Sequence, residues 1–281
     1  MADGFSVLLP VYAGDDAGHF RQAVSSATAQ QSLRPAELVV VRDGPVGEAL
    51  AEVLRELKEA GPTSPAGDVP VRIVELADNQ GLAVALERGL AACAHEIVAR
   101  ADADDISLPQ RFAVQVPLVA GGLDLLGSAI TEFVDDPAVP GMSRVLPAQA
   151  AEISATARFR DPFNHPSVVY RRSAVSRAGG YQHLDLLEDY WLFARMIATG
   201  ARVANVPEPL VLYRVGAGAY RRRGGVRLLK AELQLQWRFR AAGFTSVPQF
   251  LRNVVVRGGY RLVPEPARRL AYRRMISPAR R

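Results

Sequence analysis

The chain has 281 residues, 49% of them apolar, and a formal net charge of +5. This length and composition allow one large domain with a sizeable core, or a domain with an appendage. The single cysteine, Cys93, excludes an internal disulfide and a cysteine-based zinc site, and it gives no sign of an oxidising compartment. We expect no secretion signal, because the amino terminus is acidic and the first apolar run stops at Pro10. No run of about 18 apolar residues occurs, so no transmembrane helix is expected either.

The charge is divided unevenly along the chain. Residues 221–281 carry fifteen Arg and one Lys against Glu232 and Glu265, a balance of +14. Residues 1–220 carry eighteen basic and twenty-seven acidic side chains, a balance of −9. Such a split predicts an acidic body at 1–220 and a basic extension at 221–281 that meets something anionic.

The first hundred residues alternate between short apolar runs and helical patterns. Near-continuous apolar runs are typical of central parallel strands. Their alternation with helices indicates a parallel α/β sheet. In chain order we expect strands at 5–11, 36–41, 71–76 and 96–101, and helices at 17–31, 46–60 and 82–93.

After residue 105 the pattern becomes mixed. Ser107, followed by Pro109, predicts the start of a helix that runs to about residue 119. The remaining elements are expected as strands at 123–133, 166–170, 203–206 and 209–215, helices at 147–157 and 188–199, and a mostly helical basic region from about 221.

Three carboxylates stand within four residues directly after the fourth expected strand. Alternate residues of an extended chain point the same way, so Asp102 and Asp104 can converge on one point while Asp105 turns aside. Hard divalent ions such as Mg²⁺ prefer oxygen ligands and keep positions open for substrate phosphates. A solvated acidic turn is the alternative, because Asp is a common turn residue.

All four expected strands end in polar or turn residues. In an open parallel sheet, ligands bind beyond the carboxyl ends of the strands, where these residues would meet. The sequence has neither the Gly-x-Gly-x-x-Gly spacing of a dinucleotide site nor a P-loop, so a phosphate would have to be handled by a metal. The strand ends are Pro10-Val11-Tyr12, Arg42-Asp43-Gly44, Asp78-Asn79-Gln80-Gly81 and Asp102-Ala103-Asp104-Asp105.

These strand ends, followed by His165-Pro166 and Glu188-Asp189, resemble in order and spacing the motifs of family 2 glycosyltransferases, over roughly residues 5–215. No single motif is strongly specific, but the ordered set is. The subgroup that the chain most resembles includes amylovoran-type bacterial exopolysaccharide transferases. The resemblance implies a GT-A nucleotide-diphospho-sugar transferase fold, with a mostly parallel central sheet flanked by helices and a basic helical C-terminal extension. Its nucleotide-binding half would span about 1–106 and its acceptor half about 107–220.

The resemblance also implies a nucleotide-sugar donor, most simply a UDP-sugar, and a divalent Mn²⁺ or Mg²⁺. Asp104 would bind the metal, with Asp102 beside it and Asp105 assisting, and the metal would neutralise charge on the leaving diphosphate. Arg100 and Arg111 would flank the donor, although a structural salt bridge is an equal alternative for either. Of the other donor-binding residues, Pro10, Val11 and Tyr12 would line the base pocket. Asp43 would bind the base or ribose, and Asp102 the ribose or sugar. Asn79 and Gly81 would form a turn close to the nucleotide, although a plain helix entry is the alternative for these two.

By the same resemblance, Asp189 is the general base that removes the acceptor hydroxyl proton, with Glu188 orienting it. One-step displacement would invert the anomeric configuration. Acids at a helix amino terminus are also favoured by electrostatics alone, which is the alternative for this pair. His165 is placed near the acceptor and Arg214 near the diphosphate. Trp191 could stack on a sugar ring or belong to the core.

The basic extension mixes apolar, aromatic and Arg residues, a pattern that suits helices lying in a membrane interface. The alternative is an extension packed on the catalytic domain with a solvated charged face. A glycan or lipid-linked acceptor would explain membrane contact, so we expect a cytoplasmic protein that is peripheral on the inner face of the cell membrane. Nucleic acid is not an expected partner, because the catalytic half is acidic and no nucleic-acid motif occurs.

The leading hypothesis is therefore a metal-dependent, inverting glycosyltransferase that extends a cell-surface or extracellular polysaccharide. Two alternatives stay open: a sugar-nucleotide nucleotidyltransferase, and a noncatalytic sugar-nucleotide-binding protein.

Overall fold

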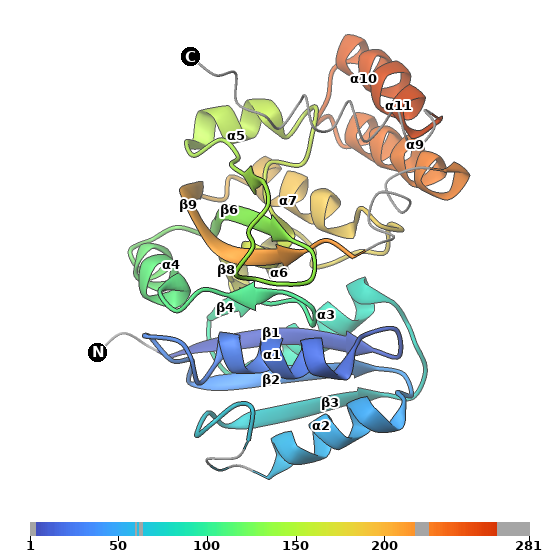
Figure 1. Cartoon of the computed structure of the whole chain (residues 1–281). Helices are drawn as coiled ribbons and strands as arrows, with labels where there is room; N and C mark the ends of the chain where they lie inside the picture. The colour runs from blue at the N-terminus through green and yellow to red at the C-terminus, as the bar shows by residue number, and fades with distance from the viewer. Residues whose placement is uncertain (1–3, 60, 62–63, 217–224, 263–281) are drawn as a thin grey trace.

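The computed structural model describes residues 4–59, 61, 64–216 and 225–262. In this part of the chain, helices flank a single curved sheet of nine strands, and the last helices lie together at one end (Figure 1). The strand order is β3-β2-β1-β4-β8-β6-β9-β5, and β7 (Ser143–Arg144) pairs with β6.

The four strands expected first form a parallel half-sheet. β1 (Phe5–Tyr12) lies between β2 (Glu37–Asp43) and β4 (Ile97–Arg100), and β3 (Val71–Leu76) adds to the far side of β2. β1 and β4 are buried on both faces, which explains why their sequences are nearly continuous apolar runs. Parallel strands deliver the residues that follow them to one edge of the sheet.

Helices cover both faces of this half-sheet. Val7 and Leu9 of β1 point into a core shared with helices α1 (Ala17–Ala27), α2 (Glu48–Lys58) and α4 (Arg111–Ala120). Leu8 points the other way, into a core shared with α3 (Leu82–Ala92), α6 (Arg172–Arg177) and α7 (Glu188–Ala198).

The second half of the sheet is mixed, so the parallel order holds only for the amino-terminal half. β8 (Val169–Arg171) is antiparallel to both β4 and β6 (Leu125–Phe133). β9 (Val203–Arg214) runs parallel to β6 and antiparallel to β5 (Ile106–Ser107). The strands expected at 203–206 and 209–215 are one strand, β9, whose register with β6 shifts around Pro209. Helix α5 (Ala150–Thr156) follows β7 and packs near β9.

Two local predictions are wrong, for the same reason. Ser107 does not cap a helix: it lies in β5, and α4 begins after Gln110. Its backbone N–H donates to Ser26 Oγ at 3.1 Å, and the next N–H donates to Leu210 O at 3.0 Å. The strand expected at 166–170 begins only at β8, because His165–Ser167 forms a turn of 3₁₀-helix (η1). Contacts from distant segments override the local signal in both cases.

The basic extension packs on the body of the molecule, residues 1–220, through α9 (Val226–Ala241). Leu235 and Phe239 of α9 form a separate hydrophobic cluster with Tyr190 and Trp191 of α7. The chain then folds back along α9 as α10 (Val247–Asn253), a turn of π-helix η2 (Val254–Gly258) and α11 (Gly259–Leu262) (Figure 1). The alternative interpretation, an extension packed on the rest of the chain, therefore holds for the side of the described extension that contacts α7. No described helix is both long enough and apolar enough to cross a bilayer.

A buried carboxylate fixes the extension. Glu232 of α9 is fully buried and accepts hydrogen bonds from Arg257 Nε at 2.6 Å and Arg261 Nη2 at 2.9 Å. Burial acts to raise the pKa of Glu232, but the charges of the two guanidinium groups lower it below its usual value. Arg257 also donates to Phe159 O at 2.8 Å, which connects the network to the body of the molecule.

We expect Glu232→Ala to lower the free energy of unfolding by about 3 kcal/mol, because it leaves two largely buried guanidinium groups without their carboxylate. Urea denaturation followed by circular dichroism measures the change. The control is Glu48→Ala, which breaks an exposed ion pair with Arg55 and should change stability by less than about 1 kcal/mol. Equal losses in the two variants would contradict the assigned role of Glu232.

Candidate functional site

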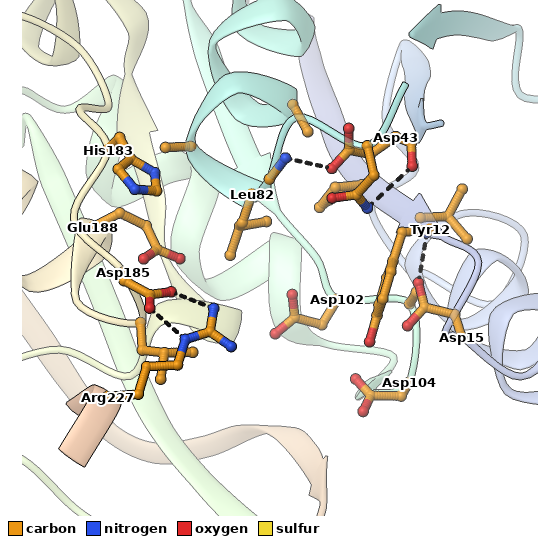
Figure 2. A pocket seen from close by; sticks show the side chains of 18 residues that line it. Tyr12, Asp15, Asp43, Leu82, Asp102, Asp104, His183, Asp185, Glu188 and Arg227 are labelled. Atoms are coloured by element: carbon orange, nitrogen blue, oxygen red, sulfur yellow. Dashed lines mark hydrogen bonds and ion pairs between the residues drawn. The ribbon is translucent and has the colours of Figure 1, made fainter. Parts of the chain in front are cut away.

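A cavity of about 460 Å³ opens at the carboxyl ends of the parallel strands (Figure 2). Its walls come from the carboxyl ends of β1 and β2, the residues that follow β1, β3 and β4, and the start of α3. The loop before α7, the first residue of α7 and the first turn of α9 complete them. We call it the first cavity. Of the residues predicted from the sequence, it is lined by Pro10, Val11, Tyr12, Asp43, Asn79, Gly81, Asp102, Asp104 and Glu188.

Asp43 joins the ends of two strands. Its Oδ1 accepts a hydrogen bond from the N–H of Gln80 at 2.7 Å, and its Oδ2 accepts one from the N–H of Gly81 at 2.9 Å. Gly81, which precedes α3, has a positive φ of 88°. Gly44 has a positive φ of 84°, and a Cβ added to it would lie 2.6 Å from Asn79 N. Glycine is required at both turns. The carboxylate thus fixes the wall of the first cavity, a role that the sequence did not indicate.

The acidic triplet lies across the first cavity from this turn. One carboxylate oxygen from each of Asp102, Asp104 and Asp105 lies within 4.8 Å of the others. Asp102 and Asp104 line the cavity (Figure 2). Asp105 is buried, does not line it, and keeps its Oδ2 without a hydrogen-bond partner in the described chain. Burial raises the pKa of Asp104 and Asp105, and neighbouring carboxylates raise them further. Crowded, oxygen-only ligands of this kind fit a hard divalent cation.

Three predicted arginines hold the triplet and do not line the first cavity. Arg111 is fully buried and donates to Arg100 O at 2.6 Å and Ser107 Oγ at 2.9 Å, and burial lowers its pKa to about 9. Arg100 is buried and pairs with Asp102. Arg214 donates from Nε to Asp104 O at 3.0 Å. The alternative of a structural salt bridge therefore holds for Arg100, whereas Arg111 donates to neutral oxygen atoms. The placement of Arg100 and Arg111 beside the donor, and of Arg214 near the diphosphate, stays a prediction.

The first cavity also contains residues that the sequence did not single out. Asp15 accepts a hydrogen bond from Tyr12 N at 2.9 Å, and burial together with the charges of Asp104 and Asp102 raises its pKa to about 7. Arg227 of α9 is the only Arg or Lys among the described residues that line the cavity, and its Nη2 donates to Asp185 Oδ1 at 2.7 Å (Figure 2). Of these two residues, only Asp15 could have been found from the sequence, because it lies shortly after the first strand. The Arg221-Arg222-Arg223 run, which together with Arg214 could close over the donor diphosphate, lies outside the described residues.

A second cavity, of about 330 Å³, adjoins the first, and Asp102 lines both. Consecutive acids at the start of α7 divide between them: Glu188 lines the first cavity and Asp189 the second. Burial raises the pKa of Glu188 to about 7, with the charge of Asp189 adding to the effect, and burial also raises the pKa of Asp189. The pair can therefore accept a proton near neutral pH.

His165 lies beside Asp189 in the second cavity, with 3.6 Å between its Nδ1 and Asp189 Oδ2. Its Nε2 is 2.9 Å from the hydroxyl of Tyr181. Burial, together with the charge of Arg100, lowers the pKa of His165 well below its usual value, so the ring is neutral at neutral pH. Trp191 is 7% exposed and donates to Gln182, so the core alternative applies to it.

Further polar residues of the second cavity were not predicted. Arg144 of β7 lies over the ring of Tyr213, 5.5 Å from its centroid, and Asn164 donates to Ser128 O at 2.9 Å. Arg144 Nε and Asn164 Oδ1 have no hydrogen-bond partner in the described chain. Asp161 is partly buried, and this burial raises its pKa well above the usual value, with the charge of Asp189 raising it further. Only their closeness to His165 in the sequence could have pointed to Asp161 and Asn164.

Comparisons with known proteins agree with this geometry. Residues 6–178 match the profile of Glycosyl transferase family 2. Over 233 residues the chain is 39% identical to the amylovoran biosynthesis glycosyltransferase AmsE of Erwinia amylovora, covering 82% of this chain and 84% of the relative. Over 274 residues it is 31% identical to the UDP-Gal:α-D-GlcNAc-diphosphoundecaprenol β-1,3-galactosyltransferase of Escherichia coli, covering 97% and 96%.

Solved structures share the fold at low sequence identity. S. aureus TarS in complex with UDP-GlcNAc superposes with a TM-score of 0.66 at 14% identity, covering 90% of this chain and 71% of that one. The mannosyltransferase PcManGT of Pyrobaculum calidifontis, in complex with GDP-Man and Mn²⁺, superposes with a TM-score of 0.64 at 18% identity, covering 98% and 76%. The expected fold and activity class are both confirmed: the chain is a GT-A glycosyltransferase that belongs to glycosyltransferase family 2.

Proposed function

We propose that the protein is a metal-dependent, inverting glycosyltransferase that moves a sugar from a UDP-sugar to a glycan or lipid-linked acceptor in the synthesis of a cell-surface or extracellular polysaccharide. The observation that carries the proposal is the junction of two cavities at Asp102, Glu188 and Asp189. The names of the two relatives support the product class: one is named for amylovoran biosynthesis, and the other takes UDP-Gal and a diphosphoundecaprenol-linked sugar.

The first cavity suits the donor. Pro10, Val11 and Tyr12 line this cavity and would contact the base, and the turn held by Asp43 would border the ribose. The lining carries six carboxylates and one Arg, so a diphosphate needs added positive charge to enter. A divalent cation held by Asp102 and Asp104, with Asp105 assisting, would neutralise the charge that develops on the leaving diphosphate. Arg227 can add a second positive charge by exchanging Asp185 for a phosphate oxygen.

The second cavity suits the acceptor. An acceptor hydroxyl held there gives its proton to Asp189 while its oxygen bonds to the anomeric carbon of the donor sugar. The bond from that carbon to the diphosphate oxygen breaks on the opposite side, and the electron pair leaves with the diphosphate. Attack from the face opposite the leaving group inverts the configuration. The raised pKa of Asp189 suits a general base, and its carboxylate is held by the N–H of Tyr190, which donates to Oδ1 at 2.7 Å, with Glu188 as the proposed orienting neighbour.

Arg144 and Asn164 would recognise the acceptor sugar, since each holds a polar atom that a small side-chain rotation would offer to a hydroxyl. We expect Arg144→Gln to raise the acceptor KM about tenfold and to leave the donor KM unchanged, because one hydrogen bond to a charged group is lost. The control is Arg42→Gln. Arg42 has the same exposed fraction, 28%, and also pairs with a glutamate, but it lines neither cavity. A rise in the donor KM alone would show that the second cavity does not hold the acceptor.

The proposed organisation follows the two cavities. Residues 1–220 would form the catalytic domain, with its nucleotide-binding half at about 1–106 and its acceptor half at about 107–220. In support, residues before 106 provide most of the first cavity, and residues after 129 provide nearly all of the second. A lipid-linked acceptor would place the protein at the inner face of the cell membrane, with the extension at 221–281 as the contact.

The function is tested by turnover. The protein is incubated with Mn²⁺, a panel of UDP-, GDP- and dTDP-sugars, and GlcNAc-α-diphosphate carried on a short lipid, and released nucleoside diphosphate is measured. Release that depends on the acceptor is the expected result. Release of pyrophosphate from a nucleoside triphosphate and a sugar phosphate would identify a nucleotidyltransferase. Donor binding without any release, across glycan and lipid-linked acceptors, would identify a noncatalytic binder.

A further inference from the structure

The outward side of α9 carries a stripe of exposed apolar and basic residues. Val226, Lys230, Leu233, Trp237 and Arg240 recur at alternating spacings of four and three, which places them along one side of the helix. All five are exposed, and Trp237 is 66% exposed. The opposite side of α9 is the one that packs on α7.

The stripe continues onto the helices that fold back along α9. The rings of Trp237 and Phe250 lie 6.4 Å apart between centroids, and a Cβ at Gly258 would lie 4.0 Å from Leu233. The same helices expose Val247, Leu251, Val255 and Val256. We call the exposed apolar and basic residues of α9, α10 and η2 together the outer face.

The outer face is cationic and has no acid on it. Glu232 is the only acid among residues 225–262, and it is buried with Arg257 and Arg261. Lys230 and Arg240 have no acidic partner in the described chain. The whole segment from 221 to 281 carries a balance of +14 against −9 for the rest of the chain. A partner for this face must therefore be anionic and must also accept apolar side chains.

We infer that the outer face docks on the surface of a bilayer that contains anionic phospholipids. Helices lie in such an interface when apolar residues enter the headgroup layer and basic residues meet the charged headgroups. An acidic protein surface would satisfy Lys230 and Arg240 but would leave the exposed valines and Leu251 without apolar contacts. Only the purpose of the docking, and not the docking itself, rests on the proposed function. Because α9 also carries Arg227 at the first cavity, docking would bring the catalytic site close to a lipid-linked acceptor.

The two tryptophans of the chain make the inference directly testable, because Trp191 is 7% exposed and Trp237 is 66% exposed. The full-length protein is mixed with vesicles of equimolar phosphatidylglycerol and phosphatidylcholine. We expect the tryptophan emission to shift to the blue and the protein to sediment with the vesicles. Added salt, or vesicles of phosphatidylcholine alone, should weaken both effects, since surface charges are screened by salt. No shift and no sedimentation would overturn the inference.

Variants separate the outer face from the rest of the chain. Leu233→Glu should weaken vesicle binding about tenfold or more, because it removes apolar contact and repels the anionic headgroups. Lys230→Gln combined with Arg240→Gln should abolish the preference for anionic vesicles. The control is Val139→Glu, which changes a 69% exposed apolar residue between β6 and β7 and should bind like the wild type.

Each of these variants should transfer sugar to a water-soluble acceptor at the wild-type rate, so failure of the membrane inference is distinct from failure of the proposed function. Unchanged vesicle binding by Leu233→Glu would overturn the inference. So would a wild-type dimer that Leu233→Glu converts to a monomer without change in vesicle binding, because the face would then join two copies of the chain.

Discussion

Asp189→Asn is expected to lower kcat for sugar transfer about a thousandfold, within the range that positioned general bases contribute, while UDP binding stays close to that of the wild type. Asparagine keeps the shape of the side chain but cannot accept the proton of the acceptor hydroxyl. UDP binding persists because Asp189 lines the second cavity and not the first. Acceptor-dependent release of UDP gives kcat, and calorimetric titration with UDP gives the affinity.

Asp161→Asn is the matched control, since Asp161 is an acid of the same cavity whose burial raises its pKa well above the usual value. A raised pKa favours the protonated carboxyl, which an amide resembles in shape, and no role as a base is assigned to Asp161, so this variant should lose far less activity than Asp189→Asn. Full activity in Asp189→Asn, or a larger loss in Asp161→Asn, would move the base to another residue.

The pH profile provides a second measurement on the same pair. Asp189 must be deprotonated to act, so kcat/KM should fall as the pH falls through the raised pKa values of Glu188, about 7, and Asp189. Interacting acids titrate as a pair, so the acidic limb belongs to both. Glu188→Gln removes a neighbouring negative charge, lets Asp189 lose its proton at lower pH, and should move the limb to lower pH.

The parallel half of the fold can be predicted from the sequence, because strands that are buried on both faces appear in it as apolar runs. The strands β1, β2 and β4 each contain a short uninterrupted apolar run, and topology then places the residues at their carboxyl ends at one edge. That reasoning brings Tyr12, Asp43 and Asp104 to one cavity, as the structure has them. The mixed half could not be predicted in this way, since pairings such as β8 with β4 join distant segments and no local period encodes them.

The positions of some side chains at the site could not be predicted for a related reason. The charge of Arg111 suits a phosphate and a buried carbonyl equally well, and only the packing of α4 against β4 decides that it donates to Arg100 O. Arg227 belongs to no motif, and it reaches the first cavity because Phe239 and Leu235, further along α9, pack on α7. Local sequence states which chemistry a side chain can perform, whereas distant contacts decide where it performs that chemistry.

Asp104→Ala should lower metal-dependent transfer by about a thousandfold or more, since a catalytic cation stabilises charge on the leaving group by several kcal/mol and half-buried Asp104 would be one of its ligands at the first cavity. In the wild type, a chelator should abolish transfer and Mn²⁺ should restore it. In the variant, excess Mn²⁺ should restore little. A measurement apart from turnover is calorimetric UDP binding, which Mn²⁺ should strengthen in the wild type but not in Asp104→Ala.

Asp185→Asn is the control for this experiment, because Asp185 is another acid of the first cavity but is held by Arg227, away from the triplet. It should keep the response of UDP binding to Mn²⁺. Unfolding does not explain the loss expected in Asp104→Ala: removing one of three crowded carboxylates relieves repulsion, so the metal-free variant should melt no earlier than the wild type. If Mn²⁺ still strengthened UDP binding in Asp104→Ala, the cation would be bound outside the triplet, and the acids at 102–105 would be a structural turn.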